Sequence, residues 1–234
     1  MKLLSRINKL PLFPVQLYWK DWTGDLDGIA KLIKDDEKKN PGPFSDQMPN
    51  MTITQARSAS DAIHLSEEPL YKELFGFIQG CLDDIWRQEK FQCDGFKICS
   101  SWSNIYYPNT SLNYHQHPMS AFSGVFFVKG EAPLTFMDPV MPRRNPSLMP
   151  ISPDNDIASF SLNSVPGRVV IFPHWLEHGV SNYSYDVSSI TSTPAEERIS
   201  ISFNSLPYGK INYKDGLNLS SAELNVITPE KQNG

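Results

Sequence analysis

Residues 113–118 read NYHQHP and set His115 and His117 one residue apart, in a chain of 234 residues that has only five histidines. In an extended strand, side chains two positions apart project from the same face. Two imidazoles on one face can bind a single transition-metal ion through nitrogens at about 2.0–2.1 Å. The pair is therefore a candidate for two metal ligands, although histidines on protein surfaces are also common without a metal.

A second stretch, residues 166–180 (PGRVVIFPHWLEHGV), supplies distant partners for such an ion. It begins with a Pro-Gly turn, runs through an apolar strand and reaches His174 and His178 just beyond the end of that strand. Ligands and catalytic groups gather at strand ends and in the loops that follow them. The letters HWLEH also match a zinc-peptidase motif, which requires a helix. Pro173 before the motif and Gly179 after it leave barely one turn, so we reject that interpretation.

The segment 198–204 (RISISFN) indicates a site for an anion. Its apolar residues alternate with polar ones, so Arg198 and Ser200 share the face opposite to the isoleucines. An arginine that points into a β-core is costly unless an anion pairs with it. The planar guanidinium suits a carboxylate, and the neighbouring hydroxyl adds a donor. The structural alternative is an ion pair of Arg198 with Glu196 or Glu197.

The elements that must position these residues are mostly short strands. Six segments rich in β-branched and aromatic residues are separated by turn signals, a pattern typical of a sandwich or barrel. The six are residues 96–107, 121–128, 133–138, 156–165, 168–172 and 198–204. Residues 10–19 are extended and aromatic, and their two prolines favour an edge strand.

Two helices precede these strands. Residues 24–40 form the first, and a second follows Ser66, the candidate N-cap, with Pro69 in its first turn and an apolar stripe along residues 70–86. Residues 41–65 between them are expected to form a loop. We expect a mainly β single domain with flanking helices over residues 1–234. Residues 1–91 would buttress the sheet, residues 92–207 would form the catalytic core and residues 208–234 would form a tail.

Composition excludes some classes of function. A net charge of −5 with 20% charged residues gives no reason to expect a nucleic acid or an anionic membrane as partner. No stretch approaches the roughly 18 apolar residues of a membrane span, and the N-terminal residues lack the features of a signal peptide. Three cysteines without a CxxC spacing fit a reduced compartment. We therefore expect a cytoplasmic protein.

Taken in order, these motifs resemble the Fe(II)/2-oxoglutarate-dependent dioxygenases, in particular a bacterial and phage branch of that superfamily. The resemblance spans roughly residues 96–206. Its elements are residues 113–118 (NYHQHP), 123–128 (SGVFFV), 136–139 (FMDP), 167–180 (GRVVIFPHWLEHGV) and 198–204 (RISISFN). Separate motifs in the right order make chance agreement improbable.

The resemblance implies a double-stranded β-helix, the jelly roll that cupins share, with iron at one open end. His115 matches the first metal ligand and His178 the distal one. Arg198, assisted by Ser200, would hold the outer carboxylate of 2-oxoglutarate. The implied cofactors are Fe(II) and 2-oxoglutarate, and the implied partners are O₂ and an unidentified small-molecule or peptide substrate. A further hydrogen bond to the co-substrate would come from one of three residues, Asn104, Tyr106 or Tyr107.

One position departs from the family. Most members have a carboxylate two residues after the first histidine, where this chain has His117. We favour a ligand set of three histidines, which suits Fe(II), because the fold uses i and i+2 geometry. The alternative is that Asp138 supplies an acid ligand and His117 stays outside the coordination shell.

The sequence leaves two rival functions open. One rival is a cupin-like three-histidine dioxygenase that does not use 2-oxoglutarate, and it has no need for Arg198. The other is a jelly-roll binding protein without catalysis. Residues 139–157 and 182–197 are long enough to cover the mouth of the site, and whether the chain forms a homodimer is left open.

Overall fold

The computed structural model describes residues 14–39, 51–54, 62–106, 111–130, 133–140, 159–180, 197–211 and 216–220. In chain order, its elements are β1 (Tyr18–Asp21), α1 (Leu26–Lys39), β2 (Met51–Thr54), the 3₁₀ turn η2 (Ile63–Leu65), α2 (Pro69–Glu89), β3 (Gly95–Tyr106), β4 (Leu112–His115), β5 (Phe122–Lys129), β6 (Leu134–Met137), β7 (Ser159–Leu162), β8 (Arg168–Pro173), β9 (His178–Val180), β10 (Arg198–Lys210) and β11 (Asn218–Leu219).

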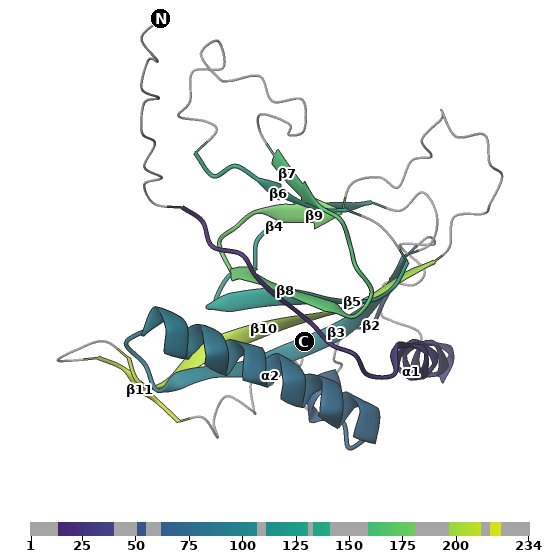
Figure 1. Cartoon of the computed structure of the whole chain (residues 1–234), viewed down its shortest axis with the longest axis horizontal. Helices are drawn as coiled ribbons and strands as arrows, with labels where there is room; N and C mark the ends of the chain where they lie inside the picture. Colours follow the sequence, from purple (N-terminus) through teal and green to yellow (C-terminus); the bar gives the residue numbers. More distant parts are fainter. Residues whose placement is uncertain are drawn as a thin grey trace, which may run out of the picture.

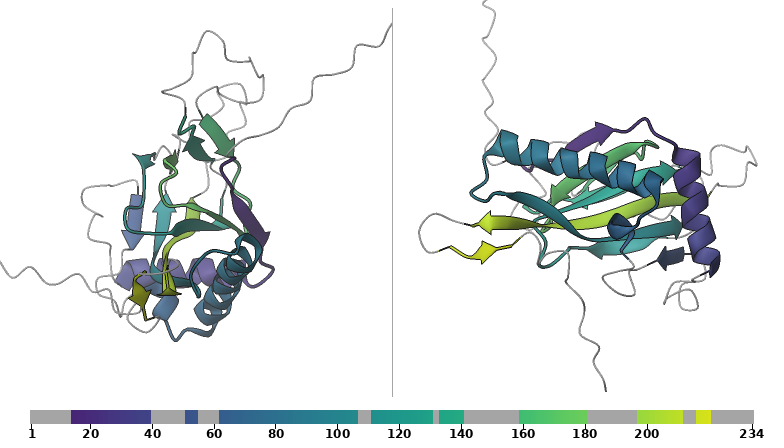
Figure 2. Two further views of the ribbon diagram at one scale, coloured as in Figure 1. Left: turned by 90° about the vertical axis from the view of Figure 1, so that its left-hand side faces the viewer. Right: turned by 90° about the horizontal axis from the view of Figure 1, so that it is seen from below.

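The strands form two antiparallel sheets that face each other (Figure 1). The larger sheet has the order β1-β8-β5-β10-β3-β2, with β11 paired to β10, and the smaller one has the order β4-β9-β6-β7. Helices α1 and α2 pack on the outer face of the larger sheet (Figures 1 and 2). This arrangement confirms the predicted double-stranded β-helix with helices on one side.

The larger sheet is buried on both faces, and strict alternation along its strands divides the apolar residues between two cores. In β8, Val169 and Ile171 pack with the helices, whereas Val170 and Phe172 face the smaller sheet. The core between the two sheets is the smaller one, and it fills only part of the space between them. Its buried members are Val125, Phe127, Leu134, Phe136, Val170, Phe172 and Leu176. The remaining space is where polar side chains gather.

Both predicted helices and the predicted edge strand are present, but their ends differ from the prediction. Helix α1 lies within the expected range, but α2 begins at Pro69 with Glu68 as its N-cap, so the predicted cap at Ser66 is wrong. The Ser66 hydroxyl instead accepts a hydrogen bond from the Glu68 N–H. The expected edge strand is β1, which begins only at Tyr18; residues 10–13 lie outside the described residues.

Three strands were not expected from the sequence. Strand β2 lies in the segment that was expected to form a loop, β9 begins at His178, which was expected to lie beyond the end of a strand, and β11 lies in the expected C-terminal tail. Strand β10 continues six residues past the predicted end of its motif. No described helix is long and apolar enough to cross a membrane.

Gly124 in the middle of β5 offers a test of this packing. A Cβ added there would lie 2.2 Å from the Phe203 ring and 2.9 Å from the carbonyl oxygen of Val170. We expect Gly124→Ala to lower the free energy of unfolding by about 1–3 kcal/mol, because the Phe203 ring must move within a close-packed core.

The matched control is Gly76→Ala on the exposed side of α2, where an added Cβ meets nothing within 4 Å. This substitution should raise the free energy of unfolding by about 0.5–1 kcal/mol, because it removes the entropic cost of a helical glycine. Urea unfolding of both variants measures the difference. Equal changes of the same sign would contradict the packing described for β5.

Candidate active site

Three histidines converge between the two sheets. The potential ligand nitrogens of His115, His117 and His178 all lie within 4.8 Å of one another. Strand β4 pairs with β9 so that His115 stands directly opposite His178, and their ring centroids are 4.5 Å apart. Strand pairing thus brings together two residues that are 63 positions apart in the sequence.

His117 reaches the same point by a different route from the one expected. Strand β4 ends at His115, so His117 lies in the turn that follows and not on the strand. Its backbone N–H donates to the carbonyl oxygen of His174 at 3.1 Å, which ties this turn to the one after β8. The ring centroid of His117 lies 5.1 Å from that of His115 and 5.0 Å from that of His178. The expected convergence is present, although a turn produces it.

In all three rings, Nδ1 lies next to an oxygen. The Nδ1 atoms of His115 and His178 are each 2.9 Å from the backbone carbonyl oxygen two residues earlier, in Asn113 and Leu176 respectively. The Nδ1 atom of His117 is 2.7 Å from Oδ1 of Asn204. A carbonyl oxygen can only accept, so Nδ1 carries the proton in the neutral form of each ring, and Nε2 then keeps a free lone pair. This is the tautomer that a metal ligand needs.

The Nε2 atom of His117 is buried and has no hydrogen-bond partner among the described residues. Burial is the main cause that lowers the pKa of His117 to about 4, followed by the charge of His115. Burial likewise lowers the pKa of His178 to about 3. At pH 7 both rings are therefore neutral, and the donor set fits a metal ion of intermediate softness, such as Fe(II).

Arg198, the first residue of β10, is a buried cation. Its side chain is 4% exposed, and its Nε and Nη1 atoms have no hydrogen-bond partner among the described residues. The rings of Tyr106 and Phe127 lie 5.0 Å and 5.5 Å from the guanidinium carbon. Burial lowers the pKa of Arg198, but a guanidinium keeps its charge in proteins. Among the described residues, no acidic side chain forms an ion pair with Arg198.

The alternative role predicted for Arg198 is not observed for the described residues. Glu197 forms ion pairs with Lys34 and with Lys129, not with Arg198. Glu196 lies outside the described residues. The inward orientation of Arg198 predicted from the alternation in β10 is confirmed.

The histidines and Arg198 line one cavity of about 360 Å³ between the sheets. Its described lining also includes Ser200, which was predicted to assist Arg198, and Asn104 and Tyr106, two of the three residues predicted as a further hydrogen-bond partner of the co-substrate. Asn104 stands opposite Ser200 on the neighbouring strand and donates through Nδ2 to the Ser202 hydroxyl at 3.0 Å. Tyr107 lies outside the described residues. The described lining contains no Asp and no Glu.

The predicted alternative ligand, Asp138, lies apart from this cluster. Its Oδ1 atom accepts a hydrogen bond from the Val140 N–H at 2.9 Å, as in a turn that closes on itself after β6. Among the described residues, the group that could hold a metal contains the three histidines and no carboxylate. The described geometry therefore favours His117 over Asp138.

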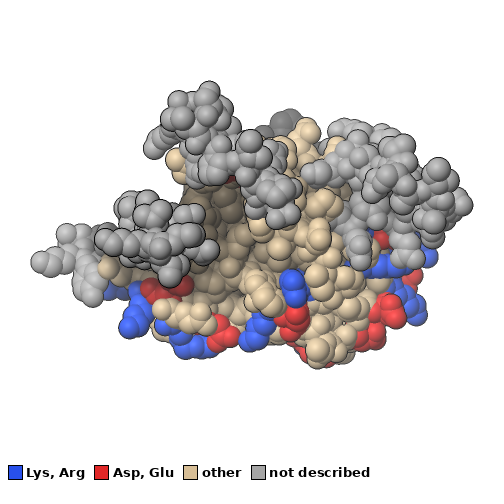
Figure 3. Space-filling model, turned by 45° about the horizontal axis from the view of Figure 1, so that its top comes forward, with Lys and Arg blue, Asp and Glu red and all other residues tan. Residues whose placement is uncertain are grey.

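The face drawn in Figure 3 is hollowed, and most of its Lys, Arg, Asp and Glu side chains lie along the lower edge of the view. The segments predicted to cover the mouth, residues 139–157 and 182–197, fall almost entirely outside the described residues.

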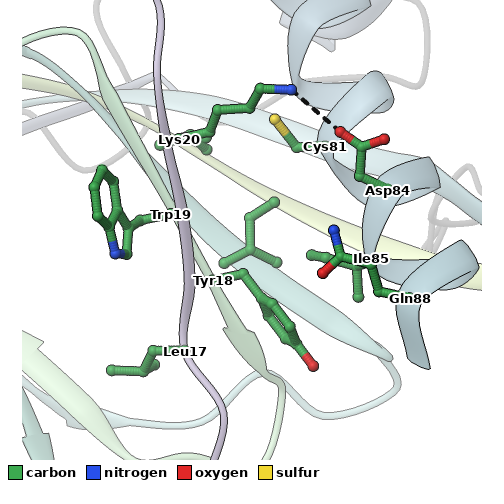
Figure 4. Close-up of a pocket in the computed structure, with 10 residues that line it drawn as sticks. Leu17, Tyr18, Trp19, Lys20, Cys81, Asp84, Ile85 and Gln88 are labelled. Atoms are coloured by element: carbon green, nitrogen blue, oxygen red, sulfur yellow. Dashed lines mark hydrogen bonds and ion pairs between the residues drawn. The ribbon is translucent and has the colours of Figure 1, made fainter.

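A second cavity, of about 350 Å³, lies between β1 and α2 (Figure 4). Its two charged side chains satisfy each other, since Nζ of Lys20 lies 3.1 Å from Oδ2 of Asp84. Burial raises the pKa of the Cys81 thiol beside them to about 11, so that thiol is inert at neutral pH. This cavity has none of the convergent unpartnered groups found between the sheets.

Comparisons with known proteins also point to the cavity between the sheets. Residues 100–204 match the model of a family described as "Putative 2OG-Fe(II) oxygenase", where 2OG stands for 2-oxoglutarate. No curated protein sequence matches the chain at a significant level.

Solved structures share the fold at low sequence identity. A prolyl-4-hydroxylase from Pseudomonas putida has a TM-score of 0.55 and 11% identity, over 83% of this chain and 94% of that one. HygX from Streptomyces hygroscopicus, solved with nickel and 2-oxoglutarate bound, has a TM-score of 0.51 and 8% identity, over 88% and 92% of the two chains. The carbocyclase SnoK from nogalamycin biosynthesis has a TM-score of 0.55 and 9% identity, over 87% and 83%.

The matched segment contains His115, His117, His178 and Arg198, all of which line the cavity between the sheets. The matched segment, which spans somewhat less than half of the chain, is thus similar in sequence to the 2OG-Fe(II) oxygenases and contributes most of the lining of this cavity.

Proposed function

We propose that His115, His117 and His178 bind Fe(II) through Nε2, and that Arg198 binds the outer carboxylate of 2-oxoglutarate. The chain is then an O₂-dependent dioxygenase that oxidises a small-molecule or peptide substrate. The observation that carries this proposal is a buried guanidinium with two nitrogens that have no hydrogen-bond partner among the described residues, in the same cavity as three imidazole nitrogens within 4.8 Å of one another. Neither group has a structural reason to be there without a ligand.

The protein's part in this chemistry is to bind, orient and exclude water. O₂ would supply the oxidising equivalents, and the bound iron and 2-oxoglutarate would activate it, with 2-oxoglutarate oxidised to succinate and CO₂. Three protein ligands leave room on the metal for the co-substrate and for O₂. The ring of Trp102 stacks on His117, with centroids 5.8 Å apart and planes at 16°, and the edge of Phe172 contacts His178. These rings hold the imidazoles in place and keep water from them.

Arg198 and Ser200 form the carboxylate end of the cavity. The guanidinium presents two unpartnered donor nitrogens, and the Ser200 side chain points to the same side of β10 and is 1% exposed. Because the three metal ligands are neutral, the ferrous ion and Arg198 together carry more positive charge than the dianionic co-substrate cancels. The loaded site is therefore more positive by about one charge than a site with a carboxylate ligand, and it favours binding of a dianion.

The two rivals explain less of the structure. A three-histidine dioxygenase that does not use 2-oxoglutarate would leave the buried charge of Arg198 unexplained. A binding protein without chemistry would not need three imidazoles whose potential ligand nitrogens lie within 4.8 Å of one another. The proposed function accounts for the histidine cluster through Fe(II) and for the buried Arg198 through 2-oxoglutarate.

Substitution of Arg198 tests the co-substrate site. Arg198→Ala should raise the KM for 2-oxoglutarate by at least about thirty-fold, because truncating one partner of a buried charge pair costs 2 kcal/mol or more. The assay is release of succinate under Fe(II) and O₂, together with the visible charge-transfer band of the anaerobic Fe(II)–2-oxoglutarate complex. The matched control is Arg168→Ala, which removes an exposed ion pair with Asp21. A KM unchanged by Arg198→Ala would favour the rival without 2-oxoglutarate.

The metal site is tested by a pair of histidine substitutions. His178→Ala should abolish binding of Fe(II) at micromolar concentration, because it removes one of three ligands. His174→Ala, four residues earlier and outside the cluster, should leave binding unchanged. Anaerobic equilibrium dialysis followed by metal analysis gives the stoichiometry. Equal binding in the two variants would mean that the ion sits elsewhere.

A further inference from the structure

We propose that Asn204 is a positioning residue that orients His117 and sets its strength as a metal ligand. This inference rests on the proposed three-histidine site and goes beyond it, because it assigns a function to the last residue of the 198–204 motif. Asn204 itself stands behind the ring of His117 and acts on the metal only through that ring.

Both neighbouring strands hold the Asn204 amide. Asn204 lies opposite Ser100 on β3 and opposite Ser123 on β5. Its Nδ2 donates to the Ser100 hydroxyl at 3.1 Å, and its Oδ1 accepts from the Ser123 hydroxyl at 2.8 Å. The same Oδ1 accepts from Nδ1 of His117 at 2.7 Å. Every polar atom of the amide is thus used, and the group that it orients is a metal ligand.

His117 differs from the other two ligands in the group that accepts the hydrogen bond from its Nδ1. His115 and His178 donate to backbone carbonyl oxygens within their own strand ends or turns. Only His117, which lies beyond the end of β4, depends on a side chain for its orientation. It is also the ligand that stands where most of the family has a carboxylate. The Asn204 side chain therefore sets the orientation of His117, the ligand that departs from the family pattern.

The direction of the amide decides whether His117 can bind a metal. With Oδ1 toward the ring, Nδ1 must carry the proton and Nε2 is free to coordinate. With the amide turned over, Nδ2 would require a bare Nδ1, and Nε2 would carry the proton instead. An imidazole with a proton on Nε2 cannot coordinate through that atom. Hydrogen-bond partners behind a ligating histidine also tune its basicity, which makes Asn204 a control point for the metal.

Two substitutions separate these effects. Asn204→Leu keeps the approximate size but removes the acceptor, and should weaken binding of the metal by about 10–100-fold. Asn204→Asp keeps an acceptor for Nδ1 and adds negative charge behind the ring. The Ser100 hydroxyl can rotate to donate to the second carboxylate oxygen. The Asp variant should bind the metal more tightly than the wild type, because a charged acceptor strengthens the imidazole as a donor.

The probe is Co(II), which is stable in air and paramagnetic. Its affinity is measured for the full chain by competition with a chelator. Proton NMR of the Co(II) form then reports the ring N–H protons as strongly shifted signals that vanish in D₂O. We expect one such signal for each histidine ligand in the wild type. In Asn204→Leu the signal of His117 should be lost through exchange with water, while the other two remain, since backbone carbonyls hold them.

Control variants separate this role from a general effect on the fold. Asn218 lies exposed on β11, so Asn218→Asp and Asn218→Leu should leave both the affinity and the NMR signals unchanged. A role in folding alone would disturb all three histidine signals together. If Asn204→Leu does not fold, Asn204→Asp still decides, because it keeps the shape of the side chain.

The outcomes distinguish this inference from the proposed function. A wild-type chain without histidine signals from bound Co(II) would overturn the three-histidine site itself. A wild-type chain that binds Co(II) as expected, with an Asp variant of unchanged affinity and unchanged His117 signal, would overturn the role of Asn204 alone. Tighter binding in the Asp variant with a displaced His117 signal supports it.

Discussion

The two-residue period of β10 is the constraint on which the rest of the structure depends. One set of its side chains, including Ile199, Ile201 and Phe203, is fully buried against the helices. The other set faces the cavity and includes Arg198, Ser200 and Asn204. A shift of one residue in register would place a guanidinium among the helices and isoleucines in the cavity. The packing of α1 and α2 therefore also fixes the positions of the groups that bind ligands.

The electrostatics of the cavity follow from what it lacks as much as from what it holds. Its described lining has one guanidinium, three histidines and no carboxylate. Burial keeps two of the histidines neutral, so they do not repel an incoming cation. The same burial makes the isolated charge of Arg198 costly until an anion arrives. In the proposed function, a carboxylate of the co-substrate would offset the buried charge of Arg198, and a metal ion would use the buried Nε2 of His117.

The sequence predicts the fold class and the inward arginine, because both depend on period-two patterns that are several residues long. It also predicts the three histidines, through their spacing and the family resemblance. It does not predict that β4 and β9 place His115 opposite His178, since strands of three and four residues are too short to show a pattern. The role of Asn204 is equally hidden, because its partner His117 is 87 residues away. The N-cap of α2 was predicted wrongly because the Ser66 hydroxyl accepts a hydrogen bond within the turn that precedes the helix.

The amide behind His117 also limits how this ligand set could change in evolution. An aspartate at position 117 would have no ring N–H to give to Asn204, and its own oxygens would accept hydrogen bonds just as Oδ1 of Asn204 does. Two acceptors facing each other repel. Conversion to a carboxylate ligand would therefore require the Asn204 amide to turn over, so that Nδ2 faces position 117 and the Ser100 and Ser123 hydroxyls exchange their donor and acceptor roles.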